Sequence, residues 1–295
     1  MVGMHPLFRS GLGLFREAKT AVGGSLWWDQ SGFLYWCDQS TGAVHRSALG
    51  GATNGGDDGA IALPPPLAVF APSQDGFVIA GKNAVALVGP GGTGLRAFAR
   101  VPHETESVRF GWGACDPYGR LVAATFDAEG SSGGTIYSIE PNGESRPIYN
   151  RAGAVSGMQW SDDGGTMWFA DVRLATIFSC GYSPAGDMTN VQPLVRGIRC
   201  SGLARDTMGG LWSGIYDGGK IARWDASGNQ SLELEIPASR ITSVAFGGAE
   251  LSTLFIATSR EGVTAQQLAT HPLSGSIFGI ETATTGYPTS PFGRS

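Results

Sequence analysis

The sequence has 295 residues, of which 42% are hydrophobic and 15% are charged, so the chain can bury a large core and falls outside the intrinsically disordered class. Its net charge is −5 and it contains no basic run, which argues against nucleic acid or an anionic membrane as a partner. The 46 glycines and 16 prolines favour many short strands over long helices. The composition therefore predicts an all-β protein.

The first twenty residues, MVGMHPLFRSGLGLFREAKT, show neither the uninterrupted apolar stretch nor the cleavage pattern of a signal peptide. No apolar run of about 18 residues, the length of a membrane span, occurs later. We therefore expect a cytoplasmic protein with no membrane partner. The four cysteines lack CxxC spacing, which indicates reduced, mostly buried thiols rather than disulfides or a zinc site: Cys37, Cys115, Cys180 and Cys200.

A repeat of about 44 residues runs along the chain. Its first element is a turn followed by a short apolar strand, found in SGFLYWCD, DGFVIAGK, YGRLVAAT, GGTMWFAD, GGLWSGIY and LSTLFIAT. Its second element is an alternating strand, found in GAVHRS, NAVALVG, GTIYSIE, ATIFSC, GKIARW and GSIFGI. This period is typical of a four-stranded propeller blade. Six repeats predict a six-bladed β-propeller.

The six blades occupy most of the chain, so we expect residues 1–295 to form a single propeller domain. The segment GLFREAK, at residues 13–19, precedes the first blade. We predict that it supplies the outer strand of the last blade, because this pairing would close the ring and remove free sheet edges.

The strand ahead of each turn is predicted to line the central channel of the propeller. Five positions before each turn lies a small, uncharged residue: Gly24, Ala68, Gly111, Ser156, Ser201 and Thr242. Two positions further back, three of the six residues are Arg109, Arg199 and Arg240, which strand alternation places on the same face. Three guanidinium groups at one channel mouth would bind a carboxylate or phosphate. The alternative is that each arginine pairs with a nearby acidic residue or lies outside the mouth.

Five longer segments carry a family resemblance: GGSLWWDQSGFLYWCDQSTGAVHRS, RFGWGACDPYGRLVAATFD, VSGMQWSDDGGTMWFAD, CSGLARDTMGGLWSGIYDGGKIARWDASG and ITSVAFGGAELSTLFIATS. In this order, from about Ala21 to Gly279, they resemble the family of gluconolactonase, regucalcin (senescence marker protein) and luciferin-regenerating enzyme. The resemblance implies a six-bladed propeller with one divalent metal at the top of its channel. It also implies hydrolysis of sugar lactones, in which the metal polarises the carbonyl group and activates water.

The resemblance breaks down at the metal. The positions that it assigns to the family's glutamate, asparagine and aspartate ligands hold Gly24, Ser156 and Ser201 in this chain. Two hydroxyl groups without a carboxylate are a poor donor set for calcium or magnesium, and zinc would lack its usual histidine, cysteine or carboxylate ligands. We therefore expect no metal and no other cofactor.

Other candidate residues come from the family's substrate motifs and from the loops near them. The resemblance implies that Arg109 binds substrate and that Glu129 contacts it, as a glutamate does in some members. Trp112 replaces a family aspartate and either stacks on a planar or apolar ligand or packs on a neighbouring loop. Tyr216, on a loop of the same face, either lines the pocket or is structural.

His103 lies in VPHETESVRF, the loop that leads to Arg109. It is either a general base near neutral pH or a solvated loop histidine. Cys200 adjoins Ser201, but strand alternation turns it away from the channel, so we expect a buried thiol.

Three functions fit these residues. The first is a metal-independent enzyme that binds a small anionic, carbonyl-bearing or lactone molecule at the arginines, with His103 or Glu129 transferring protons in ring opening, lyase or isomerase chemistry. The second is a non-catalytic propeller that binds a small ligand or a protein. The third is a conventional metal-dependent sugar-lactone hydrolase whose ligands lie elsewhere, such as Glu104, Glu106 or Asp217. The first is favoured because the mouth keeps charged and aromatic residues.

Overall fold

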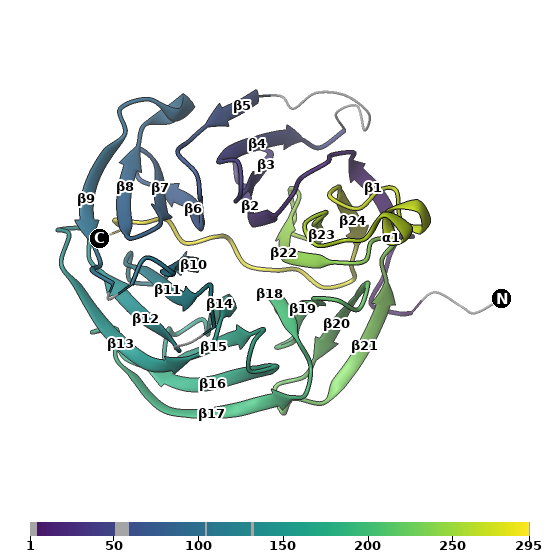
Figure 1. Cartoon of the computed structure of the whole chain (residues 1–295). Helices are drawn as coiled ribbons and strands as arrows, with labels where there is room; N and C mark the ends of the chain where they lie inside the picture. Colours follow the sequence, from purple (N-terminus) through teal and green to yellow (C-terminus); the bar gives the residue numbers. More distant parts are fainter. Residues whose placement is uncertain (1–4, 51–58, 104, 131–132, 295) are drawn as a thin grey trace. The chain divides into compact units, whose positions relative to one another are not determined.

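Six four-stranded sheets form nearly all of the secondary structure of the computed structural model, which describes residues 5–50, 59–103, 105–130 and 133–294 (Figure 1). Each of five sheets takes four strands that follow one another along the chain, and the sixth adds β1 to β22, β23 and β24. We call these sheets blades 1 to 6 in chain order.

The bounds of the strands show how regularly the blades repeat. Blades 1 to 3 consist of β2 (Gly23–Asp29), β3 (Phe33–Asp38), β4 (Ala43–Ala48) and β5 (Gly59–Ala62); β6 (Val69–Ser73), β7 (Gly76–Gly81), β8 (Ala84–Val88) and β9 (Arg96–Arg100); and β10 (Val108–Cys115), β11 (Leu121–Asp127), β12 (Gly134–Ile139) and β13 (Ser145–Ala152). Blades 4 to 6 consist of β14 (Val155–Trp160), β15 (Thr166–Asp171), β16 (Thr176–Tyr182) and β17 (Met188–Arg196); β18 (Cys200–Arg205), β19 (Leu211–Ile215), β20 (Lys220–Trp224) and β21 (Gln230–Glu235); and β22 (Ile241–Gly247), β23 (Thr253–Thr258), β24 (Ile277–Glu281) and β1 (Gly13–Arg16). Two short helical segments, the 3-10 turn η1 (Pro90–Gly92) and helix α1 (Ala265–Thr270), lie in loops.

The structure confirms the strands that the sequence predicts. The apolar strands after the turns are β3, β7, β11, β15, β19 and β23, and the alternating strands are β4, β8, β12, β16, β20 and β24. The predicted closing strand is also confirmed, because β1 pairs antiparallel with β24 through Gly13 opposite Gly279 and Leu14 opposite Phe278. One blade thus joins segments from both ends of the chain.

Burial decreases from the second to the fourth strand of each blade. All six residues of β23 are buried, whereas β21 alternates between exposed and less exposed positions. A second strand is covered on both faces and therefore reads as a continuous apolar run, while a fourth strand keeps one solvated face. This difference explains why the second strands gave the clearest repeat in the sequence.

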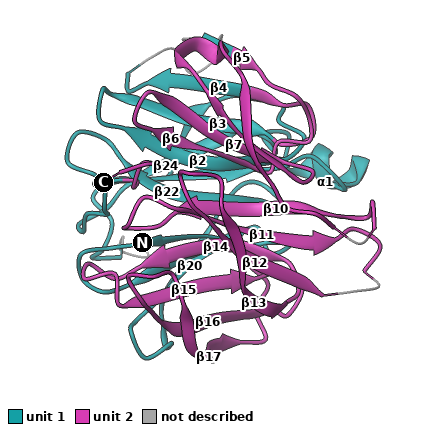
Figure 2. Cartoon of the chain, turned by 90° about the vertical axis from the view of Figure 1, so that its left-hand side faces the viewer, with its two compact units in different colours: residues 1–38, 44–60, 201–288 teal, residues 39–43, 61–200, 289–295 magenta. Residues whose placement is uncertain are grey.

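The chain divides into two compact units (Figure 2). Unit 1 comprises residues 1–38, 44–60 and 201–288, and unit 2 comprises residues 39–43, 61–200 and 289–295. Unit 2 contains blades 2, 3 and 4, and its core clusters surround Phe110 and Phe169. Unit 1 contains blades 5 and 6 with most of blade 1, and its core clusters surround Trp212 and Trp36.

A buried aspartate stabilises the turn between the first two strands of blade 5. Asp206 accepts hydrogen bonds from the Nε of Arg223 at 2.7 Å, the Nε1 of Trp212 at 2.7 Å and the backbone N–H of Gly210 at 2.8 Å. Asp116 has the same place in blade 3 and binds the Nε of Arg120 at 2.7 Å. These aspartates belong to the fold, because their oxygens are occupied by the turn itself.

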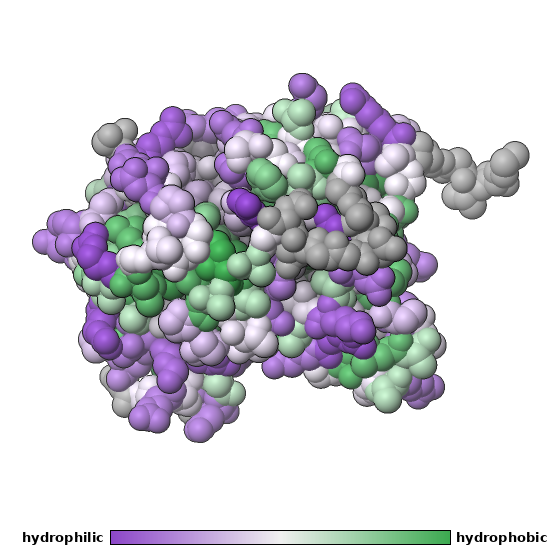
Figure 3. Space-filling view, turned by 90° about the horizontal axis from the view of Figure 1, so that it is seen from above, coloured by the Kyte–Doolittle hydropathy of each residue, from purple (hydrophilic) through white to green (hydrophobic). Residues whose placement is uncertain are grey.

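The surface combines hydrophilic and hydrophobic residues, as Figure 3 shows for one face. Large hydrophobic side chains that are exposed lie far apart in the sequence: Leu49, Leu95, Leu174 and Met208. Within the described ranges, the structure contains no helix with the length and hydrophobicity of a membrane span.

Gly202 in β18 is required where two blades of unit 1 approach each other. Its φ is +67°, and a Cβ there would lie 2.7 Å from the Cα of Ser243 in β22. We expect Gly202→Ala to lower the free energy of unfolding by about 3 kcal/mol, from the left-handed backbone and the clash together. Gly197→Ala is the control, since Gly197 has φ +79° with no atom within 4 Å of the added Cβ. Urea unfolding should show the smaller loss in the control, and equal losses would contradict the proposed clash.

Candidate functional site

The end of a blade at which its first strand begins and its second strand ends is here called its entry end. At this end of blade 4, the buried carboxylate of Asp171 accepts four backbone N–H groups. Gly153 and Ala154 donate at 2.6 and 2.9 Å, and Arg173 and Leu174 donate at 3.1 and 2.9 Å. One side chain therefore fixes both the segment that enters β14 and the turn that leaves β15.

A buried aspartate also accepts backbone N–H groups at the entry ends of blades 1 and 3. Asp38 ends β3 and accepts the N–H of Ala21 at 2.8 Å, and Asp127 ends β11 and accepts the N–H of Glu129 at 3.0 Å. Both carboxylates are buried. The entry-end loops are thus held by aspartates rather than left to solvent.

Three of the six small residues that the sequence aligns lie at interruptions of the strand pairing. The register shifts between Phe110 and Trp112 in β10, between Val155 and Gly157 in β14, and on either side of Thr242 in β22. Gly111, Ser156 and Thr242 are the extra residues at these bulges. A bulge changes the direction of a side chain and is common beside binding sites.

The three positions that the resemblance assigns to metal ligands carry no anionic group. The Oγ of Ser156 donates to the carbonyl oxygen of Cys200 at 2.8 Å, and the Oγ of Ser201 donates to that of Ile241. Gly24 pairs with Cys37 and offers no side chain. Two hydroxyl groups already engaged with carbonyl groups do not fit a divalent cation, which requires carboxylate, imidazole or thiolate donors.

Other acidic residues do not assemble a metal centre in the described part of the chain. There, no group of three or more histidine, cysteine, aspartate or glutamate side chains is close enough to hold a metal ion. Of the alternative ligands considered above, Glu106 is exposed, Asp217 forms a salt bridge with Arg240, and Glu104 lies outside the described residues.

Unit 2 gathers basic residues at the entry ends of its blades. His103 places its Nε2 3.4 Å from the carbonyl oxygen of Lys82 and its ring edge-on to Phe110, with 5.9 Å between the ring centroids. Arg109 places its guanidinium over the ring of Phe126, 5.1 Å from the centroid. Phe110 also donates its backbone N–H to the carbonyl oxygen of Lys82, so these residues form one contact network.

Two further arginines continue the network along blade 4. The Nη2 of Arg173 donates to the carbonyl oxygen of Asp127 at 2.8 Å, and the Nε of Arg199 donates to that of Val172 at 3.3 Å. We call the set Lys82, His103, Arg109, Arg173 and Arg199 the basic cluster. Its members come from segments far apart in the sequence, and all lie in unit 2.

The third predicted arginine, Arg240, lies in unit 1 and is paired. Its Nε binds Asp217 at 3.0 Å, its Nη1 donates to the carbonyl oxygen of Glu261 at 2.6 Å, and its guanidinium lies over the ring of Tyr216 at 5.2 Å. The structure thus brings together two predicted substrate-binding residues, Arg240 and Tyr216. It also gives Arg240 the acidic partner that the sequence left open as an alternative.

Trp112 and Glu129 differ in their surroundings. Trp112 is partly buried and packs against the hydrophobic cluster that contains Met158 and Trp160. Glu129 is exposed on the turn after β11, where its neighbour Ala128 donates a backbone N–H to the carbonyl oxygen of Ser107. Arg199 and Arg240 precede β18 and β22 rather than lying within them, so strand alternation does not fix their side chains.

The cysteines provide no nucleophile. All four are free and buried, which confirms the prediction of buried thiols. Burial raises the pKa of Cys37 and of Cys180 to about 12, and it raises the pKa of Cys115 as well. Cys200 is fully buried. A thiol that stays protonated in a closed core does not attack a substrate.

Arg173 and Lys82 were not predicted as site residues, because neither lies five or seven residues before one of the turns that define the repeat. The sequence nevertheless contains a signal for the loop that carries Arg173. Three second strands end in aspartate, in the segments FLYWCD, LVAATFD and TMWFAD. Such an aspartate indicates a fixed loop at the entry end, and Arg173 lies two residues beyond one of them.

Comparisons with known proteins agree with this architecture. The family model described as SMP-30/Gluconolactonase/LRE-like region matches residues 22–260. The 6-deoxy-6-sulfogluconolactonase of Pseudomonas putida is 29% identical over 260 residues, which cover 86% of this chain and 88% of that protein. The pentonolactonase XacC of Haloferax volcanii is 25% identical over 280 residues, which cover 90% and 92% of the two chains.

A solved structure shows the fold. The calcium-binding protein regucalcin from Agrobacterium tumefaciens matches with a TM-score of 0.87 over 98% of both chains, at 21% sequence identity. The match confirms the six-bladed β-propeller that the sequence predicted.

Proposed function

Because this chain belongs to the SMP-30/Gluconolactonase/LRE-like family, we propose that it is an enzyme that opens the ring of a small anionic lactone without a resident metal ion. Two relatives that align with most of the chain are lactonases by name, and one of them acts on a sulfonated sugar lactone. The observation that carries the proposal is the basic cluster at the entry ends of blades 2 to 4, in a chain whose aligned metal positions hold glycine and serine.

The proposed reaction is hydrolysis at the lactone carbonyl group. Water attacks the carbonyl carbon, His103 or Glu129 accepts the proton from that water, and the carbonyl oxygen becomes an oxyanion. A guanidinium group stabilises this charge, which is the role proposed for Arg199. The oxyanion then collapses, the ring C–O bond breaks, and the leaving alkoxide takes up the proton to give a hydroxy acid.

Arg109 and Trp112 complete the proposed substrate contacts in unit 2, and Arg240 and Tyr216 form a proposed ligand contact in unit 1. Arg199 supplies another positive charge in unit 2, next to the turn that carries Arg173. In unit 1, Tyr216 and Arg240 form one stacked pair, so we propose that a ligand meets them together rather than singly. Trp112 presents the part of its ring that the core does not cover.

Chelation tests the absence of a resident metal. We expect the purified protein to contain much less than one divalent ion per chain, and its lactone hydrolysis to change by less than about twofold after treatment with EDTA. The measurement is elemental analysis together with titration of the acid released from a panel of sugar lactones. A metal-dependent lactonase treated in parallel is the control. Stoichiometric metal with chelator-sensitive activity would support the metal-dependent alternative, and absence of any hydrolysis would support a ligand-binding propeller.

A further inference from the structure

Two guanidinium groups of the basic cluster are anchored to adjacent residues at the end of β11. Arg109 lies over the ring of Phe126, and Arg173 donates to the carbonyl oxygen of Asp127, the next residue. Phe126 and Asp127 are consecutive residues, with Cα atoms about 3.8 Å apart. Within the described ranges, neither guanidinium group forms a salt bridge, although Arg120, Arg146 and Arg240 do.

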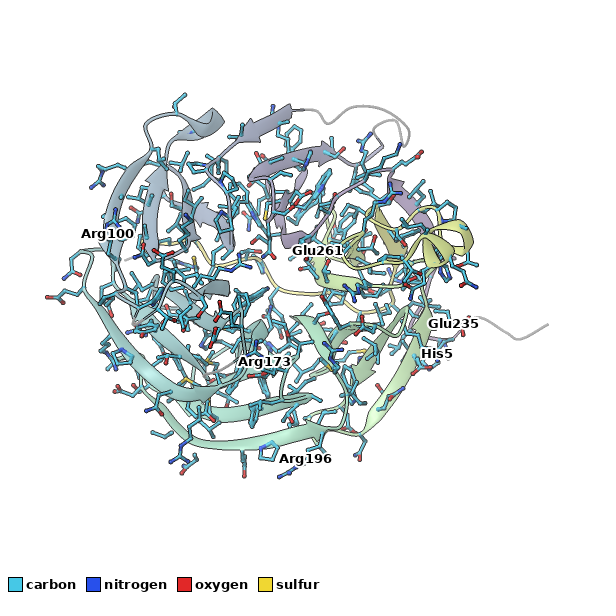
Figure 4. All side chains as sticks on the ribbon, viewed as in Figure 1. His5, Arg100, Arg173, Arg196, Glu235 and Glu261 are labelled. Carbon is cyan, nitrogen blue, oxygen red and sulfur yellow. The ribbon has the colours of Figure 1, made fainter. Side chains whose placement is uncertain are left out.

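Hydrogen bonds fix the position of Arg173 at both its backbone and its side chain. Its backbone N–H and that of Leu174 both bind the buried carboxylate of Asp171, and its side chain spans from blade 4 to blade 3. Figure 4 shows Arg173 beside β14 and β15, whereas Arg196 lies on the outer side of β17. Arg173 is thus the arginine of blade 4 that the fold anchors to the residue next to Phe126, on which Arg109 stacks.

Neither guanidinium group has a carboxylate partner in the described part of the chain, so each keeps a positive charge that attracts an anion. The carboxylate of Asp127 does not take this role, because it is buried and accepts the N–H of Glu129. Each guanidinium group uses only part of its donors: Arg109 stacks through its face and Arg173 contributes Nη2. The remaining N–H donors fit the oxygens of a carboxylate, sulfonate or phosphate group.

We propose that Arg109 and Arg173 hold an acidic group of the substrate that lies away from the reacting ring, so that the substrate is a lactone carrying a second, anionic function. This inference rests on the proposed function for the identity of the ring, but not for the anion site. Asp171 is a positioning residue in it, since it touches Arg173 and not the ligand.

Binding of compounds that cannot be hydrolysed tests the inference. The probes are 1,5-anhydroglucitol and its 6-phosphate, 6-sulfonate and 6-carboxylate analogues, with inorganic phosphate as a competitor, all measured by calorimetry. We expect at least one charged probe to bind about tenfold more tightly than the neutral one, and Arg173→Ala to remove about tenfold of that affinity. The three charged probes identify which acidic group is preferred.

The matched control is Arg196→Ala. It removes an exposed arginine of the same blade, the last residue of the edge strand β17. It should leave every affinity unchanged, and circular dichroism should show all variants folded. Equal binding of charged and neutral probes, no binding of any probe, or full affinity in Arg173→Ala would each overturn the inference. Probe binding through Arg173 without any lactone hydrolysis would instead refute the proposed function alone.

Discussion

Asp206→Ala is expected to lower the free energy of unfolding by about 3–5 kcal/mol, the range measured when one partner of a buried ion pair is removed. The carboxylate of Asp206 is fully buried and contacts both the Nε and the Nη2 of Arg223, at 2.7 and 3.2 Å. Its removal also leaves the indole N–H of Trp212 without its partner. The variant would therefore keep a positive charge in the core with nothing to compensate it.

Urea unfolding followed by tryptophan fluorescence measures this loss. The chain offers a matched control in Asp225, which caps the turn between β20 and β21 by accepting the N–H groups of Ser227 and Asn229, both at 2.9 Å, but is only partly buried. Asp225→Ala should lose much less stability, because water replaces the missing acceptor. Similar losses in the two variants would show that turn capping, and not the buried charge pair, accounts for the effect.

The same aspartate predicts how stability depends on pH. Burial tends to raise the pKa of Asp206, but hydrogen bonds from Arg223, Gly210 and Trp212 outweigh it and hold the pKa below its ordinary value of 3.8. A carboxyl group whose pKa is lower in the folded state stabilises the fold above the unfolded-state pKa, and this stabilisation is lost as the pH falls through the folded-state pKa. Below about pH 4, the stability of the wild type should therefore fall more steeply than that of Asp206→Asn.

The fold could be predicted because its determinants are local. A second strand such as β23 is buried on both faces and is bounded by turns, so the pattern that defines it lies within a few residues. The closing strand β1 was predicted from its place in the chain alone, because a ring of blades requires a partner for β24. Neither prediction needed a side-chain contact between distant residues.

The site could be predicted only in part, because its contacts join residues far apart in sequence. Arg173 reaches Asp127 across 46 positions, and Arg240 reaches Asp217 across 23. A single sequence shows that these residues exist but not that they meet. Arg109 could be proposed because it falls within a family motif, whereas Arg173 depends on a turn that Asp171 shapes.

His103→Ala is expected to lower kcat by about a hundredfold or more while changing KM little, if His103 is the general base of the proposed hydrolysis. The ring is held by Phe110 on one side and by the carbonyl oxygen of Lys82 on the other, in the loop that leads to Arg109. Added imidazole should restore part of the lost activity, which a merely structural role would not allow.

Two comparisons make this assignment decisive. His271→Ala removes another histidine, which ends helix α1 and contacts the Oγ of Ser239 at 3.3 Å, and it should leave kcat unchanged. Glu129→Gln tests the second candidate base, since glutamine keeps the shape of the side chain but cannot accept the proton from water. If Glu129→Gln abolishes the hydrolysis while His103→Ala keeps it, then the exposed glutamate performs the proton transfer. His103 would in that case serve to hold the loop of Lys82 against Phe110.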